Sequence, residues 1–133
     1  MDRIELRTKE STELIDITPK VREIVVRRGV DAGVCVVFTK HTTTGIIINE
    51  NEAGLRNDIV RLLNELVPRG KGYMHDRIDN NAHAHLRSVL LGPSVTIPIE
   101  NGGLVLGTWQ SIMFVESDGP RQREVRVEII EGR

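Results

Sequence analysis

The chain has 133 residues with 18 basic and 19 acidic side chains, and its formal net charge of -1 and 39% hydrophobic content predict one compact domain spanning residues 1–133. The near-neutral charge and an aromatic content of only 3% argue against nucleic acid as a partner. The longest apolar runs fall far short of the ~20 residues that cross a bilayer, and the charged start lacks the apolar core of a signal peptide, so we expect no membrane partner and a cytoplasmic location.

Two strands and a helix are predicted at the start of the chain. Residues 4–8 alternate apolar with charged side chains and residues 15–17 offer a second strand, so the pattern predicts an opening hairpin. Thr18 is the predicted N-cap of a short helix, with Pro19 at its first position and Gly29 as its stop.

The middle of the chain predicts two apolar strands followed by a long helix. Residues 34–39 and 44–49 are apolar on both faces, which predicts that both strands lie in the covered middle of a sheet. The spacing from Asn49 to Glu52 is that of a capping box, and apolar residues then recur at helical intervals up to Pro68.

A third helix and a run of strands are predicted for the remainder of the chain. The helix covers residues 82–90, with a buried stripe formed by Ala82, Leu86, Val89 and Leu90. Glycine-containing turns separate the strands that follow and predict consecutive antiparallel hairpins over residues 94–99, 104–106, 108–116 and 124–130. The resulting order, ββ-α-ββ-αα-ββββ, lacks a regular βαβ alternation and predicts the α+β class.

The histidines are concentrated in one stretch, in or beside predicted turns and helix starts: His41, His75, His83 and His85. Glu50 and Asp76 lie in the same stretch, and this mixture of nitrogen and carboxylate groups indicates a divalent metal site or an acid–base site. If residues 82–90 are helical, His83 and His85 are about 200° apart around the axis, so one ion contacts only one of them. The periodicity leaves open which one.

Two polar segments have a composition suited to an anion. The hydroxyls of Thr43 and Thr44 can bind phosphate oxygens, although threonine is also an ordinary strand former. Arg121 and Arg123 flank a tight turn, where their guanidinium groups can bind an anion or remain solvated.

Two further segments offer groups that could line a pocket. Asn49 follows a buried apolar run and extends a polar segment at the end of the predicted sheet. Trp109 and Gln110 offer an aromatic ring and a hydrogen-bonding amide to a ligand, with core packing as the alternative for the tryptophan.

Several short segments follow one another in a specific order along most of the chain: residues 41–45, 48–51, 84–92, 95–99 and 106–110. Together they resemble the YjbQ family of small proteins, which is linked to a secondary thiamine-phosphate synthase activity. The resemblance implies a largely antiparallel sheet curved as a half-barrel with three helices, a homotrimer, and sites near the subunit boundaries. It also assigns a family histidine to His85 and leaves His83 as the bystander.

The resemblance implies a reaction that joins a hydroxymethylpyrimidine diphosphate to a thiazole phosphate and releases pyrophosphate. Small phosphorylated metabolites are therefore the expected partners, and a divalent metal ion is the expected cofactor, Mg²⁺ for turnover or Zn²⁺ at the histidine site. The implied metal ligands are His41, His75 and His85. The implied catalytic residues are His41, Glu50, Asp76 and His85. The implied substrate contacts are Thr43, Thr44, Asn49, Trp109, Gln110, Arg121 and Arg123.

Two other functions fit the same residues. A metal-dependent hydrolase would use a histidine-bound ion with an open position to activate water on a small substrate. A non-catalytic trimeric module would hold a metabolite in the same pocket without converting it.

Overall fold

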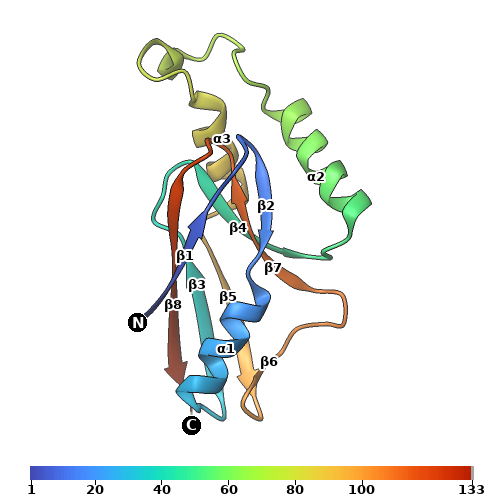
Figure 1. The fold of residues 1–133 in the computed structure, drawn as a ribbon, viewed down its shortest axis with the longest axis vertical. Helices are drawn as coiled ribbons and strands as arrows, with labels where there is room; N and C mark the ends of the chain where they lie inside the picture. The colour runs from blue at the N-terminus through green and yellow to red at the C-terminus, as the bar shows by residue number, and fades with distance from the viewer. Residues whose placement is uncertain (133) are drawn as a thin grey trace.

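The computed structural model describes residues 1–132 and contains three α-helices on an antiparallel framework, which confirms the predicted α+β class and the order ββ-α-ββ-αα-ββββ (Figure 1). The helices are α1 (Thr18–Arg28), α2 (Ala53–Leu66) and α3 (Ala82–Leu91), with a short 3-10 helix η1 (Met74–Arg77). The strands are β1 (Asp2–Arg7), β2 (Glu13–Asp16), β3 (Gly33–Phe38), β4 (Thr44–Asn49), β5 (Ser94–Glu100), β6 (Gly103–Leu104), β7 (Ser111–Glu116) and β8 (Gln122–Glu131). None of the helices in residues 1–132 is long and apolar enough to cross a membrane.

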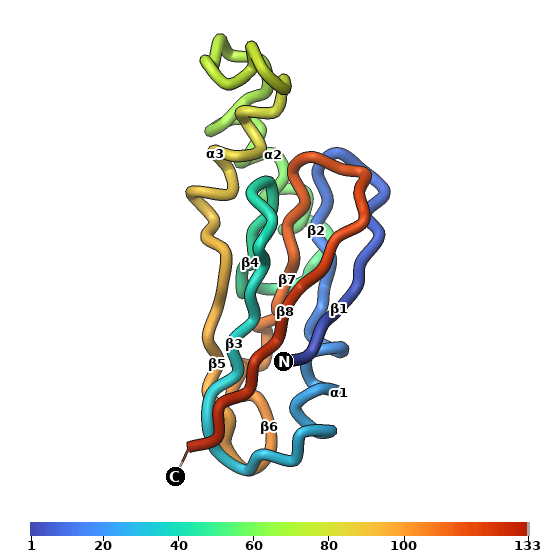
Figure 2. Tube along the Cα trace, turned by 90° about the vertical axis from the view of Figure 1, so that its left-hand side faces the viewer, coloured from blue at the N-terminus to red at the C-terminus, as the bar shows by residue number. Residues whose placement is uncertain are grey.

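The strands form two antiparallel sheets that pack against each other. Sheet A has the order β1-β8-β3-β5-β6 and curls as a half-barrel, while sheet B has the order β2-β7-β4. Figure 2 shows the long strands running along the molecule, with α1 at the end near the C-terminus and the segment between α2 and α3 at the opposite end. This arrangement gives the sandwich two distinct ends.

Strand pairing differs from the sequence prediction in two places. The opening hairpin is wrong, because β1 pairs with β8 and β2 pairs with β7, so the turn between them carries the chain from one sheet to the other. The predicted C-terminal meander is confirmed only for β5 and β6, which pair with each other, because β7 pairs with β2 and β4 while β8 pairs with β1 and β3. Alternation along a strand predicts which side chains face the core, but it does not predict which strand it pairs with.

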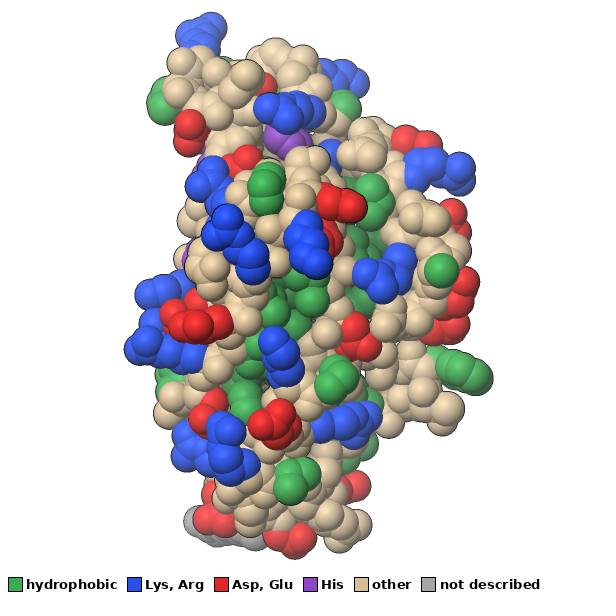
Figure 3. All heavy atoms as spheres, in the orientation of Figure 1, with side chains coloured by type: hydrophobic (Ala, Val, Ile, Leu, Met, Phe, Trp, Pro, Cys, Tyr) green, Lys and Arg blue, Asp and Glu red, His purple; other side chains and the backbone are tan. Residues whose placement is uncertain are grey.

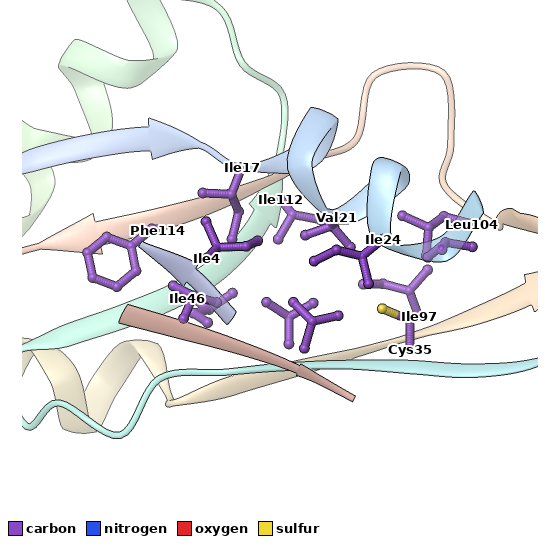
Figure 4. Close-up of a cluster of buried hydrophobic side chains, with 14 of the residues drawn as sticks. Ile4, Ile17, Val21, Ile24, Cys35, Ile46, Ile97, Leu104, Ile112 and Phe114 are labelled. Atoms are coloured by element: carbon purple, nitrogen blue, oxygen red, sulfur yellow. The ribbon is translucent and has the colours of Figure 1, made fainter. Parts of the chain in front are cut away.

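The main core lies between the sheets and beneath α1 (Figure 4). Val21 and Val25 of α1 are buried against Ile112 and Leu104, and full burial of each such side chain contributes about 1.5–3 kcal/mol. A smaller cluster on the other face of sheet B contains Leu63 of α2 with Leu14, Met113 and Val115. This second cluster explains why β4 is apolar on both faces although it is an edge strand and not the middle strand that its sequence predicts.

The predicted helix starts shift by one residue in α1 and by three residues in α2. Thr18 lies inside α1 instead of capping it, and its hydroxyl accepts a 2.7 Å hydrogen bond from the backbone of Ile112. The Asn49 capping box is replaced by Glu52, whose carboxylate accepts hydrogen bonds from the first turn of α2 at 2.7 and 2.9 Å. Gly29 ends α1 in the left-handed conformation, as the sequence predicts.

The predicted inner face of α3 is wrong except at its first residue. Ala82 is buried, but Leu86, Val89 and Leu90 are 42%, 78% and 64% exposed. The buried face instead carries His83 and Arg87. The Arg87 guanidinium donates to the Val67 carbonyl, to Asn64 and to Thr12 at 2.9–3.2 Å, so its burial is matched by hydrogen bonds.

Candidate functional site

A polar cavity of about 370 Å³ lies at the end of the sandwich remote from α1. It forms where the β3–β4 turn, the β7–β8 turn and the start of α3 meet, and chain segments distant in sequence come together there (Figure 1). Side chains from the predicted site that line it are His41, Thr43, His85, Arg121 and Arg123. The structure adds Lys40, Thr42, Asp79, Asn81 and Asp118.

The wall of the cavity is built on a buried ion pair between Arg123 and Glu116. These residues continue the core-facing rows of β8 and β7, and the guanidinium Nε and Nη2 donate to the two carboxylate oxygens at 2.8 and 2.6 Å. Nη2 of Arg123 also donates to the Thr43 hydroxyl at 2.7 Å. The Thr8 hydroxyl donates to the Glu116 carboxylate at 2.9 Å. Burial acts to raise the pKa of Glu116, but Arg123 and these hydrogen bonds outweigh it and hold the pKa below its ordinary value.

The sequence pattern does not single out Glu116 as a site residue. The available signal was an acid at the end of the apolar run Ile112–Val115, in phase with the inward residues of that strand, followed by an arginine beyond a tight turn. Because the pair is bidentate and buried, Arg123 serves first to fix the strand ends around the cavity.

His41 is held as a neutral imidazole at the cavity. Its Nε2 accepts a 3.1 Å hydrogen bond from the backbone N–H of Glu124, so the proton of the neutral ring is on Nδ1. Burial and then the Arg123 charge lower the pKa of His41, which favours the neutral ring. In this arrangement His41 offers a donor through Nδ1, whereas its Nε2 lone pair is already occupied.

Asp118 organises the opposite wall. Its Oδ2 accepts from Arg121 at 3.0 Å and from the Asn81 amide at 2.8 Å, which fixes the direction of that amide. Within residues 1–132, the Oδ1 atom of Asn81 is buried without a hydrogen-bond partner, as are Nδ1 of His83 and Oγ of Ser117. A buried unpartnered acceptor costs free energy, so Oδ1 of Asn81 marks this wall as a place where a bound donor could satisfy it.

The other histidines have distinct positions. His85 lines the cavity and its ring meets that of His75 edge-on, with centroids 4.7 Å apart. His83 is buried on the inner face of α3. Asp76 accepts a 3.0 Å hydrogen bond from the Ala82 backbone, so its carboxylate is engaged at the start of α3.

Seven predicted site residues do not line the cavity within one chain, and two of them, His75 and Asp76, lie in η1. Thr44 is buried and bonds to the Thr39 hydroxyl at 2.9 Å. The other four are Asn49, Glu50, Trp109 and Gln110, which lie at or beyond the far ends of β4 and β7. The Thr44–Glu116 pair and the Asn49–Ser111 pair are five residues apart in the ladder, or about 17 Å. Trp109 is 71% exposed there instead of forming a cavity wall.

The described residues do not form the implied metal site. Nowhere in residues 1–132 do three or more His, Cys, Asp or Glu side chains converge as metal ligands. His41 also fits poorly as a ligand, because coordination through Nδ1 would place the ring proton on Nε2, where a backbone N–H already points. The three histidines predicted as ligands therefore do not constitute a metal centre in one chain.

Charged side chains of both signs are interspersed over the face shown in Figure 3, where no extended single-sign surface is visible.

Comparison with known proteins gives one consistent result. A family model described as UPF0047 protein YjbQ-like matches residues 2–132. A UPF0047 protein of Archaeoglobus fulgidus is 52% identical over 125 residues, covering 94% of this chain and 97% of its own length. The UPF0047 protein YugU of Bacillus subtilis is 35% identical over 96% of both chains.

The solved structures agree with the sequence comparison. A YbjQ-like protein of unknown function from Sulfolobus solfataricus P2 superposes with a TM-score of 0.97 and 42% identity, over 98% of this chain and 96% of that one. A hypothetical protein from Aeropyrum pernix K1 gives a TM-score of 0.96 and 40% identity, over 98% of both chains. The chain belongs to the YjbQ/UPF0047 family.

Proposed function

We propose that the chain is a transferase of the thiamine-phosphate synthase type, which joins hydroxymethylpyrimidine diphosphate to a thiazole phosphate. The observation that supports the proposal is the polar cavity at which His41, Thr43 and His85 converge. His41 and His85 also line the neighbouring cavity, and imidazole and hydroxyl donors held on strand ends and a helix can stabilise a diphosphate leaving group.

The proposed reaction suits a neutral His41. The thiazole nitrogen attacks the methylene carbon of the pyrimidine, and the bond from that carbon to the diphosphate oxygen breaks with its electron pair. The pyrophosphate carries the charge away, so the step needs hydrogen-bond donors for the leaving oxygen and no base for a proton. His41 offers such a donor through Nδ1 because its Nε2 accepts from the Glu124 backbone.

Mg²⁺ enters this proposal with the substrate, as the counter-ion of the diphosphate. The described residues do not form a metal site of their own, and no step is assigned to a protein-bound ion.

A second candidate is a metabolite-binding module that uses the same cavity without turnover. It is favoured by the ion pairs within the wall, since Arg121 is paired with Asp118 and Arg123 with Glu116. A wall whose charges are already compensated can hold a ligand in place but adds less stabilisation to a departing anion.

We also propose that the chain assembles as a homotrimer. The exposed apolar face of α3, formed by Leu86, Val89 and Leu90, continues to Phe38 across a second cavity and resembles an interface more than a free surface. Light scattering at micromolar concentration should give three times the 14.9 kDa mass of one chain, and a monomer or a dimer would contradict the assembly.

The decisive experiment is product detection by mass spectrometry with both substrates, Mg²⁺ and a high concentration of protein. We expect slow formation of thiamine phosphate, and His85→Ala should reduce it on the order of 10²-fold, as for a lost hydrogen-bond donor to the leaving group. Lys20→Gln, on the outer side of α1, is the matched control and should keep the wild-type rate. Absence of product from the intact assembly would reject the transferase and leave the binding module.

A further inference from the structure

The polar cavity has no surplus of positive charge. Arg121 is paired with Asp118, and Arg123 with the buried Glu116 behind it. Asp79 adds a further carboxylate to the lining, against Lys40 as the remaining cation. A phosphate placed among these groups would meet two carboxylates at short range, and like charges at such distances repel.

A second cavity of about 520 Å³ shares a wall with the first and differs in charge. The shared wall consists of Lys40, His41, Thr42 and His85. Beyond it the second cavity continues over Ser88 of α3 and has no carboxylate in its lining.

Lys40 is the cation that both cavities have in common. It takes part in no ion pair among residues 1–132. Glu124 lies close enough to sense its charge, but the ion pairs of Glu124 are with Arg3 and Arg126. The ammonium of Lys40 is therefore available to a ligand anion.

The lining of the second cavity also matches the organic part of a phosphate ester. Thr42 and Ser88 bring hydroxyl donors, while Phe38, Val89 and Pro93 form an apolar wall. Phe38 and Val89 also belong to the face assigned to the subunit interface, so a ring placed against them would lie at a boundary between subunits.

We propose that the phosphate of the ligand binds in this second cavity, at Lys40 with Thr42 and Ser88, and not between Arg121 and Arg123. The ligand class is a phosphate ester with an apolar or aromatic body. The neighbouring acid-lined cavity then receives a part of the ligand that carries N–H donors, which suit Asp79, Asp118 and the Asn81 carbonyl. This assignment rests on the proposed function and specifies where its phosphorylated substrate lies.

The test is titration calorimetry of the assembled protein with two probes, inorganic phosphate and benzyl phosphate. Lys40→Gln should weaken binding of both probes by about tenfold or more, because a hydrogen-bonded charge is lost. Ser88→Ala should weaken it by about threefold through loss of one neutral hydrogen bond. Arg121→Gln and the control Lys20→Gln should leave the affinity within about twofold. Benzyl phosphate should bind more tightly than phosphate to the wild type.

Several results would overturn the assignment. These are wild-type affinity in Lys40→Gln, a larger loss in Arg121→Gln than in Lys40→Gln, or no binding of either probe by the wild type. The binding assay contains no second substrate, so its outcome is separate from turnover. Lys40-dependent binding without product would reject the transferase and keep the phosphate site. Product formation with an unchanged KM in Lys40→Gln would reject the phosphate site alone.

Discussion

Helices α1 and α3 have similar lengths and both pack against the sheets, yet they bury opposite kinds of side chain. α1 buries Val21, Ile24 and Val25 and exposes charged residues. α3 buries His83 and Arg87 together with two alanines, and it exposes Leu86, Val89 and Leu90. α1 therefore completes the core of its own chain, whereas α3 uses its polar face to organise one end of the molecule and leaves its apolar face for another surface.

Removal of the Arg87 side chain from α3 should produce the largest loss of stability. Arg87→Ala leaves the Val67 carbonyl and Asn64 without their donor and creates a cavity, so we expect a loss of about 3 kcal/mol in unfolding free energy. Urea denaturation measures it. The exposed Arg22→Ala on α1 is the matched control, with a change within about 0.5 kcal/mol. Equal effects of the two substitutions would mean that the buried guanidinium is not a structural element of α3.

Truncation of a core residue in α1 should have the next largest effect. Val21→Ala removes two buried carbon groups and should cost about 2 kcal/mol of unfolding free energy, with the oligomeric mass unchanged. Val89→Ser on α3 is the counterpart. It should leave the stability of one chain nearly unchanged and shift the assembly towards smaller species in light scattering. A large loss of chain stability in Val89→Ser, with the assembly intact, would contradict the division of roles.

The close approach of α3 to sheet B offers a way to displace the helix by one methyl group. A Cβ atom at Gly45 would lie 2.7 Å from Cβ of Leu91, so Gly45→Ala must push α3 away from β4. We expect a cost of about 1–2 kcal/mol in thermal unfolding. Gly107→Ala, where a Cβ would meet Gln110 at an ordinary 3.5 Å, is the control and should change little. Equal melting temperatures of Gly45→Ala and Gly107→Ala would mean that α3 adjusts its position more freely than its packing indicates.

The smallest expected effect is a dependence on pH at the cavity end. The pKa of Glu116 lies below its ordinary value of 4.5 in the folded chain, because Arg123 and its hydrogen bonds outweigh the effect of burial. The carboxylate therefore contributes stability that is present above pH 4.5 and is lost as the pH falls through the folded value. Denaturation between pH 7 and pH 3 measures it, and Glu116→Gln should flatten the profile. A wild-type profile in Glu116→Gln would assign the acid sensitivity to other carboxylates.

The elements were predictable where their signals are local. The bounds of β4 and the stop of α1 at Gly29 follow from alternation, periodicity and a glycine. Strand partners were not predictable, because β1 would pair equally well with any strand of matching faces. The burial of the polar side of α3 was also not predictable. The burial of Arg87 depends on acceptors at Asn64 and Val67, and periodicity carries no information about hydrogen bonds from another helix.

The same distinction applies to the candidate site. His41 and Thr43 were found because they lie together in one polar turn, which the structure places at the cavity. Glu50 was grouped with them because it lies in the same stretch of sequence, and Trp109 because its ring can contact a ligand, but β4 and β7 run away from the cavity and carry both residues to the other end. Lys40 and Asn81 were passed over because their significance depends on ion pairs and hydrogen bonds formed by their neighbours.

The contacts of Arg87 also bear on how the chain tolerates change in length. Residues 68–81 leave the body just after Val67 and return at α3, and Arg87 joins both of these points. The loop between them is thus closed by the folded body, and its exposed tip includes Gly70 and Gly72. Each doubling of such a loop costs only about 0.6 kcal/mol of closure entropy. A labelling sequence inserted between these glycines should therefore leave the sandwich intact and provide a handle beside the cavity.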